Sequence, residues 1–236
     1  MPFRPPPESR RQVAGVPFDT AVDFAAAARQ RYDQADRQPR NRDPSKCKAL
    51  LEFRAGGGRP RAIFWSAKMA IDTDGPAAGP GHKTGKQLDP TGQNVTSFRF
   101  ANGKSIPAEA VPYIVLPQNE AETGPFDPAV AIGDVAIVIY KDMITAAICG
   151  DLGPVKKIGE ASIRVHESLQ PACPDPCRRD ANGFCAKARN SSVEEDVLYF
   201  VFPDSAFGDG ELTLDNIPTK LKERAFALYN QLRGAS

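Results

Sequence analysis

The stretch that determines the predicted fold is Met143-Ile-Thr-Ala-Ala-Ile-Cys-Gly-Asp-Leu-Gly-Pro-Val-Lys-Lys-Ile-Gly-Glu-Ala-Ser-Ile-Arg-Val165. Two apolar runs rich in β-branched residues, 144–149 and 158–165, flank a turn that contains Gly153-Pro154 and two lysines. This composition is typical of two strands joined by a loop. We therefore predict a strand over each run and their pairing as a hairpin.

Two acids, Asp151 and Glu160, lie at the edges of this loop, and each follows a glycine, Gly150 or Gly159. Glycine allows a sharp turn and leaves room for a ligand beside the carboxylate. In a hairpin both carboxylates would lie near one end of the sheet. Two acids across a cleft are what glycosidic bond cleavage requires. The alternative is a solvated hairpin tip, because acids at loop edges are common.

The composition is that of an ordinary soluble globular protein, with 41% hydrophobic and 25% charged residues in a chain of 236. The 22 prolines and 19 glycines indicate many turns and hence short strands. No apolar run approaches the roughly 18 residues of a membrane helix. The N-terminus has no apolar segment of the kind found in secretory signals, so none is visible in this sequence.

Charge is unevenly distributed, although the net charge is only +1. Residues 1–48 carry ten basic and six acidic side chains, whereas residues 72–160 carry eleven acids and seven bases. A nucleic-acid-binding protein would show a concentrated basic surface with aromatic residues. The acidic working region instead favours a cationic ligand.

Three of the five cysteines, Cys173, Cys177 and Cys185, cluster in a loop rich in Pro, Asp and Asn. We favour a structural disulfide within this loop over a zinc site, because neither histidine of the chain lies at a ligand spacing from them. Their pairing stays open. Cys149 lies in an apolar run and is predicted to be a buried small hydrophobic residue.

The predicted fold is mainly β, a compact β-barrel with N- and C-terminal helices packed outside. Residues 1–48 are predicted to be a flexible Pro/Arg-rich segment plus a helix over 18–35, and residues 49–236 the catalytic barrel domain. Short strands separated by turns indicate the barrel over about residues 50–212. A closing helix is expected over 215–232, with Pro218 in its first turn and Gly234 ending it.

Asp72-Thr-Asp-Gly75 follows an apolar run and has two interpretations. Asp72 and Asp74 could be acids at the mouth of a cleft. They could equally form an Asp-rich turn that caps its own backbone. An EF-hand is not expected, because neither a third acid nor a late glutamate follows.

Five segments together resemble the chitosanases of glycoside hydrolase family 75 and occur in the same order. Members of that family are endo-acting, inverting hydrolases of chitosan with a compact β-barrel, for which the double-psi type is one option. The matching segments are 64–75, Thr96-Ser97, 111–117, Gly133-Asp134 and 150–162.

The resemblance implies that Asp151 and Glu160 are the catalytic pair, that chitosan is the substrate and that the protein is secreted. Because Glu160 faces the apolar 158–163 strand, we expect it to be the general acid and Asp151 the base, or the reverse. We also expect no cofactor or metal, no nucleic acid, no membrane and a monomer. Peptidoglycan cleavage and non-catalytic carbohydrate binding are the alternatives. Trp65 and Tyr140 are candidate sugar platforms or core residues. The other substrate-binding candidates are Asp72, Asp74, Thr96, Ser97, Tyr113 and Asp134.

Overall fold

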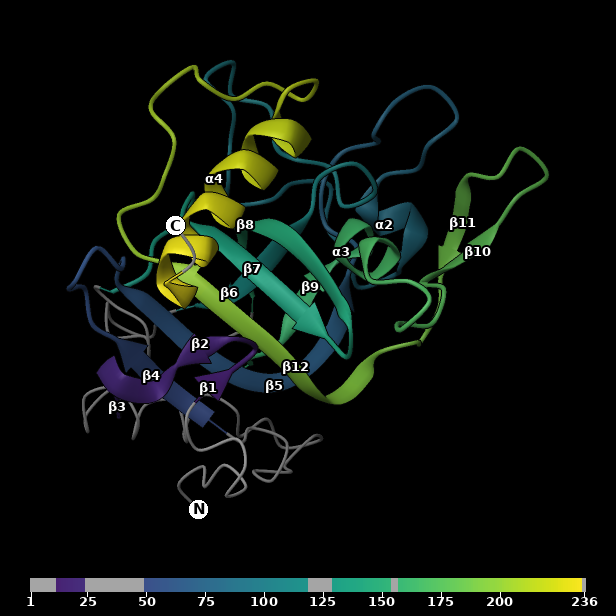
Figure 1. Cartoon of the computed structure of the whole chain (residues 1–236). Coiled ribbons are helices and arrows are strands. Elements are labelled where there is room, and N and C mark those ends of the chain that lie inside the picture. The colour runs from purple at the N-terminus through teal and green to yellow at the C-terminus, as the bar shows by residue number, and fades with distance from the viewer. Residues whose placement is uncertain (1–11, 24–48, 119–128, 154–156, 235–236) are drawn as a thin grey trace.

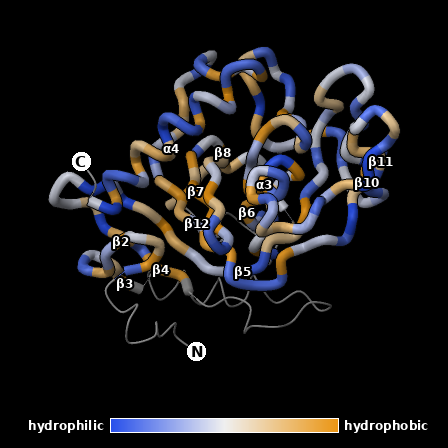
Figure 2. Tube along the Cα trace, turned by 45° about the vertical axis from the view of Figure 1, so that its right-hand side comes forward, coloured by the Kyte–Doolittle hydropathy of each residue, from blue (hydrophilic) through white to orange (hydrophobic). Residues whose placement is uncertain are grey.

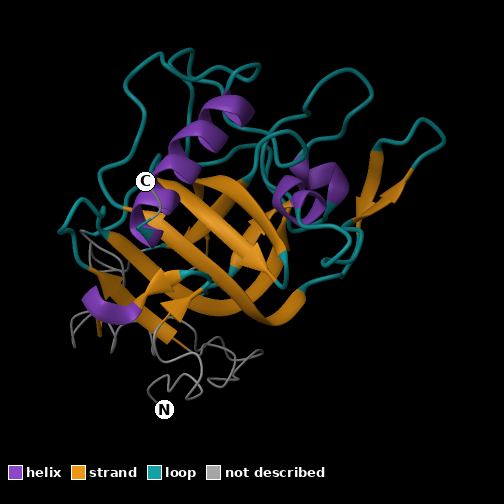
Figure 3. Cartoon of the chain, viewed as in Figure 1, coloured by secondary structure: helices purple, strands orange, loops and turns teal. Residues whose placement is uncertain are grey.

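The computed structural model describes residues 12–23, 49–118, 129–153 and 157–234. Most of its regular structure is strand, gathered in one central barrel, and the helices lie at its periphery (Figures 1 and 3). The mainly β prediction is therefore confirmed.

Six strands in the described part of the chain close into a barrel, in the order β12-β7-β8-β6-β9-β5, with β5 returning to β12. Strands β4 and β3 continue the sheet from the outer edge of β5. The barrel strands are β5 (Ala62–Asp72), β6 (Tyr113–Pro117), β7 (Val135–Tyr140), β8 (Met143–Gly153), β9 (Glu160–Ser162) and β12 (Val193–Phe202). The other strands are β1 (Gln12–Val13), β2 (Val16–Pro17), β3 (Ala21–Asp23), β4 (Ala49–Phe53), β10 (Cys177–Arg179) and β11 (Cys185–Ala188).

The barrel strands are apolar on both faces, which explains their almost continuous hydrophobic runs. Successive residues point to opposite faces, so Ile63 and Trp65 enter one buried cluster while Phe64 enters another. The second cluster also contains the apolar face of the C-terminal helix. In Figure 2 the hydrophobic colour is concentrated along β7, β12 and neighbouring strands.

The prediction that the strands carrying Asp151 and Glu160, β8 and β9, pair as a hairpin is wrong. β6 lies between them, parallel to β8 and antiparallel to β9. The second run also ends as a strand at Ser162, and α3 (Ile163–Ser168) follows. The Ser162 side chain accepts a hydrogen bond from the Val165 backbone N–H, a helix N-cap that overrides the β preference of Ile163 and Val165.

The N-terminal prediction needs correction in its described part. Residues 12–17, expected to be flexible, form the β1–β2 hairpin, in which Val16 is fully buried. The helix predicted over 18–35 begins instead as a 3-10 turn, Phe18–Thr20, and the strand β3. Residues 24–35 lie outside the described residues.

The C-terminal helix is confirmed as α4 (Ile217–Arg233), which crosses the outside of the barrel in Figure 1. Leu221, Ala225 and Leu232 are buried on its barrel side. Gly234 ends the helix in the left-handed conformation, at φ 74°, which a glycine adopts without steric cost.

A disulfide joins Cys177 to Cys185 and ties together the β10–β11 hairpin, confirming the expected bridge in this loop. Cys149 and Cys173 are free and buried. A short helix, α2 (Gly85–Leu88), lies between β5 and β6 in the chain. None of the helices in the described part of the chain is long and apolar enough to cross a membrane.

Candidate active site

A cleft of about 560 Å³ opens where β5 and β8 end and β9 begins, and it brings together acids that are far apart in the sequence. Asp151 and Glu160 both line it, together with Asp72 and Asp74. All except Asp74 are buried as residues. The described lining contains five acids and two bases, an excess of three acids.

Asp151 is aimed into the cleft by a bulge in β8. Ile114 of β6 pairs with Cys149 but the next residue, Val115, pairs with Asp151, so Gly150 is the extra residue. Bulges of this kind redirect the side chains beside them. A Cβ at Gly150 would lie 2.5 Å from the Cβ of Tyr113, so only glycine fits there. The room predicted beside this acid is thus filled by protein.

Three hydrogen bonds hold one oxygen of Asp151. The backbone N–H and the hydroxyl of Ser97 donate to Oδ1 at 2.9 and 2.6 Å, and the Leu152 N–H donates at 2.8 Å. Donors converging on a carboxylate oxygen stabilise its negative charge. Ser97 therefore positions Asp151, a role that its place in the sequence did not reveal.

Glu160 begins β9, and its position depends on the glycine before it. Gly159 has φ 77°, and a Cβ there would lie 2.2 Å from the Lys68 carbonyl oxygen. The Gly159 carbonyl accepts a 2.8 Å hydrogen bond from the Ala70 N–H, which locks β9 beside β5. Lys157 Nζ lies 2.6 Å from Glu160 Oε1.

The Asp72–Asp74 segment satisfies both of its interpretations. Asp72 Oδ1 accepts a 2.8 Å hydrogen bond from the Asp74 N–H, which is the self-capping turn. Both side chains nevertheless line the cleft. Asp74 Oδ1 accepts from the Gln93 N–H at 2.7 Å, and its carbonyl accepts from the Tyr113 hydroxyl at 2.9 Å.

Burial raises the pKa of three of these acids. It is the main cause at Asp72, whose pKa lies well above its ordinary value and is raised further by the charges of Glu160 and Asp74. The pKa of Asp74 is raised to about 6, also mainly by burial. At Glu160 burial raises the pKa even though Lys157 opposes it. The cleft therefore holds carboxyl groups that retain protons at higher pH than free ones.

Three of these acids could together hold a cation. One carboxylate oxygen from each of Asp72, Asp74 and Asp151 lies within 4.8 Å of the other two. Oxygen donors of this type suit hard cations such as Ca²⁺ or Mg²⁺. The expectation that no metal takes part stays a prediction.

Two of the predicted substrate-binding residues do not present their side chains to the cleft. Tyr113 is fully buried, and its hydroxyl supports the Asp74 backbone instead. Asp134 lies outside the described lining and accepts hydrogen bonds from the Ala131 and Ser205 N–H groups.

The remaining aromatic and polar candidates divide in the same way. Thr96 and Ser97 line the cleft, but the Thr96 hydroxyl is engaged with the Ile106 backbone. Trp65 is buried and stacks on Tyr199, so it is a core residue. Tyr140 is half-buried at the end of β7 and does not line the cleft.

Lys157 and Gln93 are site residues that sequence reasoning missed, since it treated Lys157 only as part of a turn. Its position three residues before Glu160 was the available signal. Gln118 also lines the cleft, and nothing in the sequence distinguished it.

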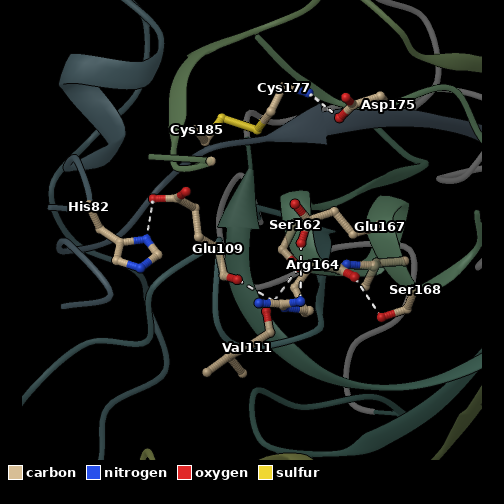
Figure 4. A network of polar contacts seen from close by, with 12 residues as sticks. His82, Glu109, Val111, Ser162, Arg164, Glu167, Ser168, Asp175, Cys177 and Cys185 are labelled. Carbon is tan, nitrogen blue, oxygen red and sulfur yellow. Dashed lines mark hydrogen bonds and ion pairs between the residues drawn. A yellow bond between two sulfur atoms is a disulfide. The ribbon is translucent and has the colours of Figure 1, made fainter. Parts of the chain in front are cut away.

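A second polar cluster lies outside the cleft, between α3 and the β10–β11 hairpin, and its central part is drawn in Figure 4. Glu109 lies 3.2 Å from His82, while Glu167 lies 3.2 Å from Arg164 and 2.6 Å from Arg179. We call these five residues the paired network. Its acids are matched by bases, so it has the arrangement of a structural cluster.

The chain matches the family described as the fungal chitosanases of glycosyl hydrolase group 75 over residues 69–216. The chain belongs to this family. The protein is thus a glycoside hydrolase of the chitosanase type. The group 75 match includes Asp151, Glu160 and the Asp72–Asp74 turn. A search of curated protein sequences found no match.

Proposed function

We propose that the protein is an endo-acting hydrolase that cleaves β-1,4 linkages of chitosan with inversion, using Asp151 and Glu160. The observation that carries this proposal is the meeting of both buried acids in one negatively charged cleft. A cationic amino-sugar polymer is attracted to such a cleft, whereas a neutral polysaccharide gains nothing from its charge. An open cleft, rather than a closed pocket, suits cutting within a polymer.

In this proposal Asp151 is the general base. The three donors on its Oδ1 fix the orientation of the carboxylate, so that it can accept a proton from water. Inversion requires that water to fit between the two carboxyl groups, at a separation of ~6.5–9.5 Å.

Glu160 is the general acid, because burial raises its pKa and favours the protonated form. Lys157 opposes this at 2.6 Å in the free protein. When the substrate enters the cleft, its ammonium group competes with Lys157 for neighbouring carboxylates such as that of Asp74. Exchanging the roles of the two acids is the alternative within the same mechanism.

The disulfide supports action outside the cytosol. Cys177 and Cys185 form a bridge in the β10–β11 hairpin, and such bridges persist mainly in oxidising compartments. We therefore propose that the protein works in a secreted or extracellular setting.

The test is product analysis on defined polymers. We expect reducing ends to be released from chitosan but not from purified peptidoglycan sacculi, and proton NMR to show initial products with the anomeric configuration opposite to the substrate's. Release from sacculi alone would replace chitosan by peptidoglycan. Binding to chitosan without release of any sugar would identify a non-catalytic binding barrel. Retained configuration would remove the inverting mechanism.

A further inference from the structure

A second hollow of about 820 Å³ adjoins the cleft. The two share Val95 and Arg99 in their linings, so they lie next to each other on the surface. We call it the outer pocket; its walls are formed mainly by residues 76–77, the turn 99–105, Gly210 and the segment 212–215.

The outer pocket has an apolar lining that faces solvent. Val95 and Leu214 are 47% and 39% exposed, and Pro76 and Leu212 line the same hollow. Two of the four large hydrophobic residues that are exposed in the described ranges therefore lie together here. Apolar surface gathered in a hollow is typical of a ligand site, because covering it is favourable.

The charge of the outer pocket is opposite to that of the cleft. Its charged lining residues are Arg99, Lys104 and Asp215, two bases against one acid, whereas the described cleft lining has five acids and two bases. A protonated glucosamine is attracted to the cleft and repelled here. An N-acetylated unit carries no charge and presents a methyl group to the apolar lining.

Two amides supply matching donors. The side-chain carbonyls of Asn94 and Asn102 accept hydrogen bonds from the backbone N–H groups of Lys86 and Lys104, at 3.3 and 3.0 Å. Their NH₂ groups are then the atoms able to donate to the carbonyl oxygen of an acetamido group.

We propose that the outer pocket binds an N-acetylglucosamine unit of a partly acetylated chitosan chain whose scissile linkage lies over Asp151 and Glu160. This inference rests on the proposed function. It makes the enzyme selective for the position of acetyl groups along the chain, in addition to the deacetylated units drawn into the cleft.

The test compares kcat/KM on fully deacetylated and half-acetylated chitosan for the wild type and for Leu214→Asp. Leu214 lines the outer pocket but not the cleft, and its exposure lets the variant fold. A carboxylate there attracts ammonium, removes the apolar contact for the acetyl methyl group and loses hydration when that methyl group covers it. We expect the ratio of kcat/KM on half-acetylated to fully deacetylated polymer to fall about tenfold, the scale of one lost apolar contact.

The matched control is Ile144→Asp, which introduces the same charge at a position of similar exposure, 37%. Ile144 lies at the end of β8 opposite to the end that carries Asp151. Product sequencing by mass spectrometry should show acetylated units at a fixed distance from the cut in the wild type and scattered units in Leu214→Asp. An unchanged ratio in Leu214→Asp, or an equal change in the control, overturns the inference. Failure of the wild type to cut either polymer would instead overturn the proposed function.

Discussion

The cleft and the paired network are two polar clusters of the same protein, and their charges are arranged in opposite ways. In the network Glu109 and Glu167 each face a base at 3.2 Å or less. Among the cleft acids of the described chain, only Glu160 has an ion pair, with Lys157.

This difference shows how a folded chain distinguishes support from chemistry. Acids matched by bases satisfy each other and stabilise the structure around them. Acids crowded together in a buried cleft raise one another's pKa, as Glu160 and Asp74 do at Asp72, and this costs stability. Such a cost indicates that function, rather than folding, is the reason for the cluster.

The largest effect on activity is expected when a catalytic acid of the cleft is neutralised. We expect Asp151→Asn and Glu160→Gln to lower kcat on chitosan by about 10²–10⁴-fold, because each removes a group that transfers a proton. The measurement is release of reducing ends, with circular dichroism to check folding.

Glu109→Gln is the matched control, since it neutralises a buried acid of the network. Its kcat should stay within about twofold of wild type. If a cleft variant keeps a tenth of wild-type activity, its residue is not one of the catalytic pair. If Glu109→Gln loses as much as the cleft variants, the division between the clusters fails.

The sequence could identify these acids but not the way they are brought together. The glycines before Asp151 and Glu160 drew attention to them, yet the structure needs those glycines because Tyr113 and Lys68 approach closely. The hairpin prediction failed because β6, distant in sequence, inserts between β8 and β9 through a parallel pairing that no local pattern encodes.

The fold class was more accessible than the site. Proline- and glycine-rich turns between apolar runs indicated many short strands, and the apolar repeat with Pro218 and Gly234 indicated α4. The partners of an acid depend on tertiary contacts, which the sequence does not show. Asp134 and Asp72 were therefore both predicted to bind substrate. Only the structure separates Asp134, bound by backbone N–H groups, from Asp72 in the cleft.

A smaller effect is expected at Ser97, whose hydroxyl donates to Asp151 at 2.6 Å. Ser97→Ala removes this bond but keeps the backbone donor, so we expect kcat to fall about tenfold, since hydrogen bonds to charged groups contribute roughly 1.5–3 kcal/mol. Ser97→Thr keeps the hydroxyl and should restore most of the activity. A shifted pH profile in the alanine variant alone would show that Ser97 acts through the Asp151 carboxylate, while equal loss in both variants would indicate a packing defect.

Ionisation of Asp72 is expected to lower the stability of the folded protein. Because its pKa is raised in the folded protein, the folded state binds more protons than the unfolded state above the ordinary value of 3.8, and stability falls as pH rises through this range. Asp72→Asn removes that loss and keeps an acceptor for the Asp74 N–H. We expect the Tm at pH 7 to rise by about 2–4 °C, the shift that about 1 kcal/mol produces in a chain of this size.

The gain should shrink as the pH approaches 4, because the carboxyl is then protonated in the folded state and close to half-protonated in the unfolded state. Asp142→Asn, at an exposed position in the turn between β7 and β8, is the control and should leave the difference between pH 4 and pH 7 unchanged. A lower Tm for Asp72→Asn at pH 7 would mean that the cleft charge is not a source of strain.

The smallest effect is expected in the paired network. Glu167→Gln removes contacts with two arginines that are themselves 43% and 38% exposed, so solvent screens much of the attraction. We expect a loss of about 0.5–1 kcal/mol in the free energy of unfolding, measured by urea denaturation, and most of that difference should vanish in 1 M salt. Activity on chitosan should not change, because none of the network residues lines the cleft. A tenfold loss of kcat with this small loss of stability would contradict the prediction. It would show that α3, which carries Arg164 and Glu167, transmits strain to Glu160, which lies just before it in the chain. The two clusters would then have to be treated as one.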